Sequence, residues 1–140
     1  TVASKHSGIK INFDDLQTKK NYSFMKAVGP TKLGLIMFSK ELSKKLEGTG
    51  VTVNSLHPGL AKSNILHDVP ALVRFIFTLM STSSEKCAET SIYLATSDEV
   101  KNTSGKYFEN KKETPTGANA NNEAEIKRLW DVSMQLAKLS

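Results

Sequence analysis

Apolar residues recur through the middle of the chain at helical spacing. Between positions 30 and 47 the spacing is three and four residues, which places the apolar side chains on one helical face: Leu35, Phe38, Leu42 and Leu46. Pro30 suits the first turn of a helix, and Gly48 suits the left-handed residue that ends one. We therefore expect a helix over residues 30 to 47.

Three short stretches have the composition of strands. Residues 51 to 56 are β-branched and apolar, and proline cannot donate to a ladder, so the following His57, Pro58 and Gly59 should leave the strand. Residues 1 to 4 are small and β-prone, like the tail of a strand, and residues 105 to 108 read as a short final strand.

The remaining segments alternate between polar loops and helices. Residues 5 to 27 should form an irregular surface connection, and residues 109 to 121 a loop. An apolar segment up to Met80 predicts a short helix, either a lid over a ligand cleft or a plain buried helix.

Two more helices are expected towards the end of the chain. Thr82 to Glu85 matches a capping box, and the helix after it should pack through a narrow face of small residues: Ala88, Ile92 and Ala95. Asn122 with Glu125 can cap a last helix, whose inward residues should be Ile126, Leu129, Trp130, Ser133 and Ala137.

This alternation predicts an α/β fold with a partial Rossmann-like, doubly wound parallel sheet and flanking helices. A right-handed crossover places the helix at 30 to 47 between the strands at 1 to 4 and 51 to 56. The sheet would have about three strands, and its first edge would be bare. A ligand site should lie beyond the carboxyl ends of the strands.

Composition narrows the function classes. The 140 residues, 39% hydrophobic and 24% charged, suit one globular domain. The net charge of +5 comes from dispersed lysines without a clustered basic stripe, which disfavours nucleic-acid binding. The single Cys87 excludes an internal disulfide and is read as a packing residue. No apolar run reaches the length of a membrane span, and no metal-ligand spacing is present.

The order of these motifs closely resembles the retinol-dehydrogenase-like branch of the short-chain dehydrogenase/reductase family. That branch carries a Tyr-x-x-x-Lys pair on a helix, then a Leu-Glu-Gly-x-Gly-Val turn, then His-Pro-Gly after a strand. The corresponding positions here are Val28, Lys32, Leu46 to Val51, and His57 to Gly59. The resemblance covers nearly all of residues 1 to 140, as the carboxyl-terminal portion of a single domain of the family.

The resemblance implies an oxidoreductase that transfers hydride between NADP or NAD and an alcohol or carbonyl. It assigns catalytic roles to Ser4, which would hydrogen-bond the substrate oxygen, and to Lys32, which would also hold the nicotinamide ribose. It assigns cofactor contacts to Pro58, Gly59 and Ser63 as well. His57 is common in the branch and is not a catalytic base there.

Valine stands where the family has its catalytic tyrosine. Val28 lies four residues before Lys32, and its side chain has no proton to give or take. A second Tyr-x-x-x-Lys pair, Tyr22 and Lys26, lies six residues too early relative to the helix and the Pro-Gly loop. A tuned phenol is the general acid/base of the implied reaction, so the chemistry should be impaired.

The sequence leaves three interpretations open. A glycine-rich turn that enters a helix is missing, because Gly48 and Gly50 follow a helix instead, so weak or no cofactor binding is expected. The chain is then an impaired oxidoreductase, a non-catalytic module that binds a partner or an apolar ligand, or an incomplete sequence of an active enzyme in which Val28 is a variant or an error.

The resemblance also suggests partners and a location. The substrate would be a small hydrophobic alcohol, aldehyde or ketone, and the helix at 30 to 47 could form a homodimer. Residues 69 to 80 could touch a membrane surface. The expected location is the cytoplasm or the cytoplasmic face of an intracellular membrane.

Overall fold

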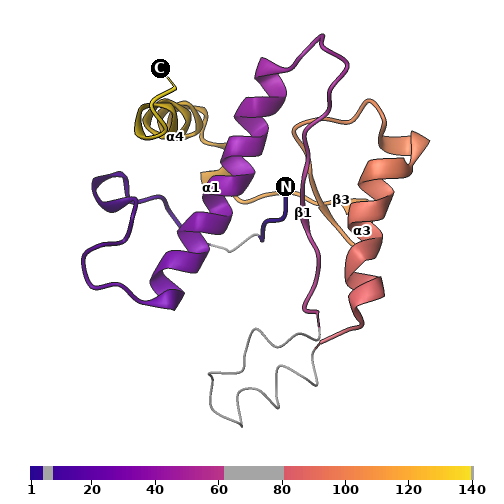
Figure 1. Ribbon diagram of the computed structural model, residues 1–140, viewed down its shortest axis with the longest axis horizontal. Helices are drawn as coiled ribbons and strands as arrows, with labels where there is room; N and C mark the ends of the chain where they lie inside the picture. The colour runs from indigo at the N-terminus through magenta and orange to yellow at the C-terminus, as the bar shows by residue number, and fades with distance from the viewer. Residues whose placement is uncertain (5–7, 62–80, 140) are drawn as a thin grey trace.

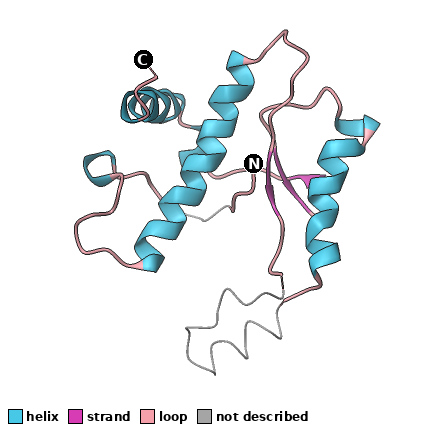
Figure 2. Ribbon diagram, viewed as in Figure 1, coloured by secondary structure: helices cyan, strands magenta, loops and turns pink. Residues whose placement is uncertain are grey.

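A central sheet separates two groups of helices in the computed structural model, which describes residues 1–4, 8–61 and 81–139. Helices α1 (Phe24–Lys45) and α4 (Glu123–Leu136) lie on one side of the sheet, and α3 (Ser84–Thr96) lies on the other (Figures 1 and 2). The expected lid lies outside the described residues. In the described part of the chain no helix is long and apolar enough to cross a membrane.

The sheet is built from short strands in the order β1 (Ser55–His57), β2 (Tyr107–Glu109) and β3 (Lys112–Glu113). β1 and β2 are parallel. The amino-terminal segment pairs in parallel with β1 through a bridge between Val2 and Leu56. The expected α/β fold, with its mainly parallel sheet, is confirmed.

The strand expected at residues 51 to 56 is shorter and ends later, because β1 covers Ser55–His57, and two other expectations about the strands are wrong. Residues 109 to 121 were expected to be a loop, but β3 pairs antiparallel with β2 across a turn in which Asn110 and Lys111 have φ of 50° and 62°. Lysine rarely adopts this left-handed conformation, so the sequence gives little sign of the turn. His57 stays in β1 opposite Glu109, because the residue before a proline is itself biased towards extended backbone.

Helix α1 begins earlier than Pro30. Its N-cap is Ser23, whose hydroxyl oxygen accepts a hydrogen bond from the Lys26 N–H at 3.3 Å. Pro30 therefore lies inside the helix, where its missing N–H removes one bond to the carbonyl of Lys26. The amphipathic run on both sides of Pro30 is long enough to outweigh that loss.

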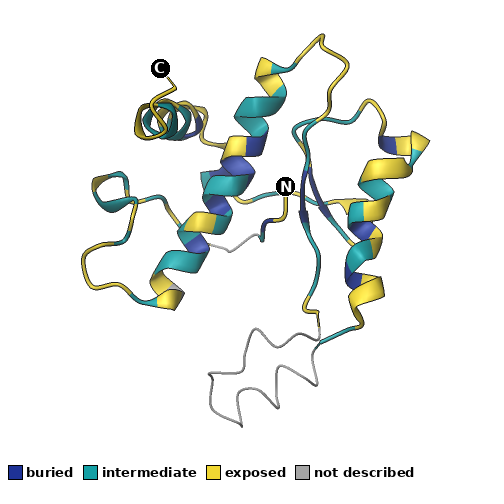
Figure 3. Cartoon of the chain, viewed as in Figure 1, coloured by how far each residue is buried: buried dark blue, intermediate teal, exposed yellow. Residues whose placement is uncertain are grey.

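Helix α1 packs on two sides. Its buried side chains face the sheet and form a core with the amino-terminal segment, β2 and α4 (Figure 3): Ala3, Leu33, Ile36, Met37, Tyr107, Ala120 and Ile126. On another side, Phe38 stacks on Trp130 of α4 with ring centroids 5.1 Å apart, and the Lys45 ammonium lies 5.0 Å from the same ring. These contacts fix α4 alongside α1.

The other two helices match the expectations in part. Helix α3 is capped by Ser83 and buries Cys87 and Thr90, whereas Ile92 is 58% exposed, so the predicted face of small residues is wrong. The small-residue stripe did not identify the packing face because larger partly buried neighbours, such as Tyr93 and Leu94, contact the sheet core instead.

Helix α4 is capped by Asn122 as expected, and its Ile126 is buried. Leu129, Trp130 and Ser133 are half-buried. Ala137 is the residue after the helix and is exposed, which corrects the expectation that it faces inward.

We predict that Gly105→Ala lowers the free energy of unfolding by about 1–3 kcal/mol. Gly105 has φ of +74°, and a Cβ there would lie 2.7 Å from the Ser43 hydroxyl oxygen. Urea unfolding measures the change. Gly117→Ala is the control, because nothing lies within 4 Å of its Cβ position, and it should change stability by less than about 0.5 kcal/mol. Equal effects of the two substitutions would contradict the packing of Gly105 against α1.

Candidate functional site

The carboxyl ends of two neighbouring parallel strands bring a serine and a histidine together. The Ser4 hydroxyl oxygen lies 2.9 Å from Nδ1 of His57, in a partly buried position. Ser4 follows the segment that pairs with β1, and His57 is the last residue of β1. In open α/β sheets ligands bind beyond these strand ends, so this pair defines the candidate site.

Backbone hydrogen bonds hold the two strands in register. The Ala3 N–H donates to the Leu56 carbonyl at 2.8 Å, and the Leu56 N–H donates to the Thr1 carbonyl at 2.9 Å. The amino-terminal ammonium also donates to the Asn54 carbonyl at 2.8 Å. These backbone hydrogen bonds therefore fix the position of Ser4, in addition to the contact between its side chain and His57.

The loop after β1 turns sharply at Gly59. Its φ of +88° is left-handed, and a Cβ there would lie 3.5 Å from Sγ of Cys87. Cys87 is buried at the end of the first turn of α3, which agrees with its interpretation as a packing residue. Downstream, the Thr82 N–H donates to the Leu60 carbonyl at 2.8 Å. The loop at Pro58 and Gly59 is thus held against the start of α3.

Lys32 lies on α1, one helical turn after Val28. Both side chains are half-buried, and Lys32 forms no hydrogen bond or ion pair with the residues that the structure describes. The neighbouring Leu33 packs in the same core cluster as Ala3. The turn of α1 that carries Lys32 therefore packs next to the strand that carries Ser4.

Ser4 also lines a small cavity of about 220 Å³, whose wall includes Leu33, Ile36 and the segment 116–120. Asn119 closes one side, because its side-chain amide donates to the Ile9 carbonyl at 2.6 Å. The Ser4 hydroxyl therefore lies between His57 on one side and a cavity on the other.

The structure does not bring every sequence-predicted residue to this place. Ser63 lies outside the described residues. Tyr22 precedes α1 and is 67% exposed, so Tyr22 and Lys26 do not share a helical face. His57 was expected to have no catalytic role, and its contact with Ser4 depends on the register of the paired strands, which no local sequence pattern contains.

The Ser4 hydroxyl and the half-buried backbone turn at Gly59, at the ends of neighbouring strands, are groups of the kind that can hydrogen-bond one end of a nicotinamide dinucleotide, its nicotinamide riboside. A pyrophosphate requires a glycine-rich turn that enters a helix. Among the described residues, the turn with Gly48 and Gly50 follows α1, so it does not supply that second site.

Within residues 1–4, 8–61 and 81–139, no three His, Cys, Asp or Glu side chains are close enough to hold a metal ion.

The parallel strands and the helices on both faces of the sheet are those of a partial Rossmann-like α/β fold. A crystal structure of an uncharacterized protein from Mycobacterium paratuberculosis has a similar fold, with a TM-score of 0.64 and 23% identity. The similarity covers 92% of this chain and 45% of that chain. No family model matches the sequence.

Sequence comparison identifies the relatives more closely. The chain is 43% identical over 130 residues to human retinol dehydrogenase 14, covering 88% of this chain and 38% of that protein. It is 39% identical to human retinol dehydrogenase 13, covering 96% and 43%, and 37% identical to mouse retinol dehydrogenase 12, covering 91% and 41%.

These proteins are homologues, and the resemblance to the retinol-dehydrogenase-like branch of the short-chain dehydrogenases/reductases is confirmed. The chain spans about two fifths of the length of the curated relatives it matches.

We predict that Ser4→Ala shifts the ¹⁵N resonance of His57 Nδ1 and changes the ratio of its neutral tautomers by about two- to tenfold, because one hydrogen bond of about 0.5–1.5 kcal/mol is lost. Two-dimensional NMR of the imidazole nitrogens measures both. Ser84→Ala, on the exposed first turn of α3, is the control. An unchanged Nδ1 resonance in Ser4→Ala would show that the contact is not formed.

Proposed function

We propose that the chain forms the substrate side of a retinol-dehydrogenase-like oxidoreductase that exchanges hydride between NADP or NAD and a small hydrophobic alcohol, aldehyde or ketone. The observation that carries the proposal is the Ser4–His57 contact at the strand ends, next to the turn of α1 that bears Lys32. The retinol dehydrogenases to which the chain is similar support the reaction class.

Ser4 is proposed to hold the reacting oxygen of the substrate. A hydroxyl has one donor proton and two acceptor lone pairs. Whether His57 donates to Ser4 or accepts from it therefore decides whether the Ser4 hydroxyl can donate a hydrogen bond to the substrate. If Nδ1 of His57 carries a proton and donates to Ser4, the serine O–H can donate to a carbonyl oxygen. If Nδ1 accepts from Ser4, the serine oxygen can only accept from an alcohol. His57 is thus proposed as a positioning residue.

Lys32 is proposed to bind the cofactor. It has no tyrosine beside it whose pKa it could lower, because Val28 stands at that position. In the relatives' family the lysine lowers the pKa of a tyrosine one turn earlier, and the bound nicotinamide supplies the hydride. Val28 cannot move a proton, so in this chain proton transfer would fall to water or to the Ser4–His57 pair. Loss of a general acid/base costs a factor of about 10²–10⁴ in rate. The proposed enzyme is therefore strongly impaired.

Val28 also favours a second candidate, a non-catalytic module. Such a module would keep the strand ends and the Ser4 cavity for a partner or an apolar ligand and would need no proton donor. The further proposals of a homodimer through residues 30–47, of a cytoplasmic location and of membrane-surface contact at 69–80 belong to either candidate. The last segment lies outside the described residues.

We predict that Val28→Tyr raises NADPH-dependent reduction of retinaldehyde at least about a hundredfold. The measurement uses a chimaera that joins the nucleotide-binding half of human retinol dehydrogenase 14 to this chain. The restored phenol would lie one turn before Lys32, where the ammonium can lower its pKa.

Val28→Phe is the matched control, because it adds the same ring without the hydroxyl. A rate in Val28→Tyr that equals the rate in Val28→Phe, in chimaeras that bind NADPH, would contradict the oxidoreductase assignment and leave the non-catalytic module as the function.

A further inference from the structure

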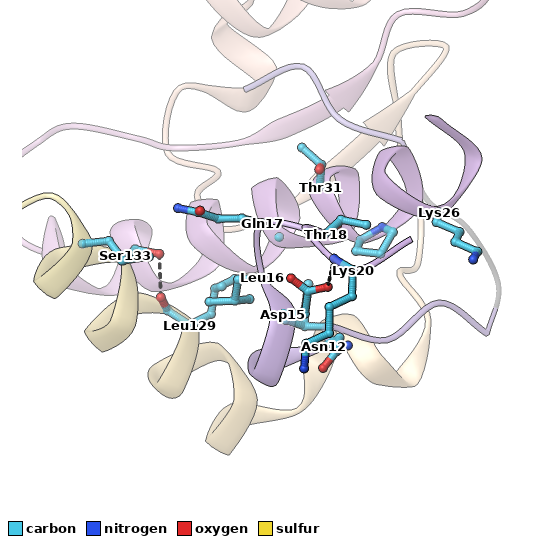
Figure 4. Close-up of a pocket in the computed structure, with 14 residues that line it drawn as sticks. Asn12, Asp15, Leu16, Gln17, Thr18, Lys20, Lys26, Thr31, Leu129 and Ser133 are labelled. Carbon is cyan, nitrogen blue, oxygen red and sulfur yellow. Dashed lines mark hydrogen bonds between the residues drawn. The ribbon is translucent and has the colours of Figure 1, made fainter. Parts of the chain in front are cut away.

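A second, larger cavity lies away from the candidate site. It has a volume of about 400 Å³, is partly open to solvent and is lined by α1, α4 and the segment that precedes α1 (Figure 4). Its wall contains none of Ser4, Lys32, His57, Pro58 and Gly59. Pockets of about 300–1,000 Å³ with mostly apolar walls are typical of small-molecule sites. The cavity is therefore of a size that could hold a small molecule away from the candidate site.

Most of the wall is apolar. Side chains from three segments contribute to it: Ile11, Leu16, Pro30, Leu129 and Leu136, with Gly34 opening the space between them. Leu136, the last residue of α4, is 62% exposed. A cavity with such a wall favours an acyl or other hydrocarbon chain, because it removes apolar surface of both partners from water.

Of the three hydroxyl groups in the wall, those of Thr31 and Ser133 have already used their protons, and that of Thr18 is the third. The Thr31 hydroxyl donates to the Ala27 carbonyl at 2.8 Å, and the Ser133 hydroxyl donates to the Leu129 carbonyl at 2.6 Å. These groups cannot donate to a ligand without breaking a bond to their own helix. The donors that remain for a ligand must come from other residues.

Besides the Thr18 hydroxyl, those donors are cationic or amide groups, and in Figure 4 the Gln17 amide lies towards Ser133 while the two lysines lie on the other side. Gln17, Lys20 and Lys26 line it, and Lys26 makes no ion pair with any residue that the structure describes. In Figure 4, Lys20 and Lys26 lie on one side of the cavity, and Leu129 and Ser133 of α4 lie on the opposite side. The cavity thus has a cationic end and an apolar end.

The carboxylate in this wall is held by the backbone. Asp15 accepts hydrogen bonds from the N–H groups of Lys19 and Lys20 at 2.8 and 2.9 Å, and these bonds lower the pKa of its carboxyl group. Its charge therefore stabilises the loop that presents Lys20. With two ammonium groups and one carboxylate, the lining keeps a net positive charge.

We infer that this cavity binds an amphiphile of the fatty-acid class, with its hydrocarbon chain between α1 and α4 and its carboxylate at Lys20 and Lys26. The free groups of the wall are donors and cations, which match an acceptor-rich anionic headgroup. The site is separate from the strand ends, so this inference stands whether or not the chain reduces carbonyls.

The test is binding of dodecanoate to the 140-residue chain, measured by isothermal titration calorimetry and by NMR shifts of the Gly34 and Leu129 amides. The double variant Lys20→Ala/Lys26→Ala should weaken binding about fivefold or more, because it removes both of the exposed ammonium groups that would pair with the carboxylate. The control Lys10→Ala/Lys112→Ala removes the same charge from exposed lysines outside the cavity and should bind as the unmodified chain does.

A cavity-filling variant tests the apolar part. A Cβ at position 34 would lie 3.6 Å from Leu129 Cδ2 and 3.8 Å from Ile11 Cδ1, so the side chain of Gly34→Leu would enter the cavity. Binding should be lost while the circular dichroism spectrum shows that the helices remain. If the variant fails to fold, the two lysine variants still decide the matter.

Three results would overturn the inference. Equal weakening in both lysine double variants would show that only net charge matters. Equal affinity for dodecanoate and for dodecyltrimethylammonium would show that the headgroup is not recognised. Binding to vesicles with anionic phospholipids, without binding of monomeric dodecanoate, would assign the lysines to a membrane surface instead.

Discussion

The pairing of residues 1–4 with β1 is the constraint on which the rest of the molecule depends. Two backbone hydrogen bonds set the register, from Ala3 to the Leu56 carbonyl and from Leu56 to the Thr1 carbonyl. This pairing makes β1 an interior strand, places Ala3 under α1 and brings the Ser4 hydroxyl to His57. Without it, the core on this side of the sheet loses a wall and the candidate site loses one of its two polar groups.

Two faces of helix α1 border two separate cavities. The turn with Leu33 and Ile36 packs against the sheet and borders the Ser4 cavity, while the turn with Pro30 and Gly34 faces α4 and the larger cavity. Consecutive residues of a helix point about 100° apart around its axis, so residues that are close in sequence can contact different parts of the protein. Val28 stands at the position that the resemblance assigns to a tyrosine, and it is half-buried within this same helix.

Much of the fold could be predicted from sequence because local signals agree with the packing. The parallel pairing in the sheet, the helix capped by Asn122 and the burial of Cys87 follow from the alternation of elements, the capping residues and the residue type. The start of α1 and the hairpin at Asn110 and Lys111 do not, since Pro30 is a strong helix-start signal and lysine rarely has positive φ. The pair of Ser4 and His57 depends on strand register, which no local pattern contains.

Amide hydrogen exchange tests the strand pairing most directly. The account predicts that the amides of Ala3 and Leu56 exchange at least about a hundredfold more slowly than in an unstructured peptide, like the Ser55 amide that is bonded to the Lys106 carbonyl. Exchange of Ala3 and Leu56 at the unstructured rate, with Ser55 still protected, would contradict it, because β1 would then pair with β2 alone and Ser4 would not be held at His57.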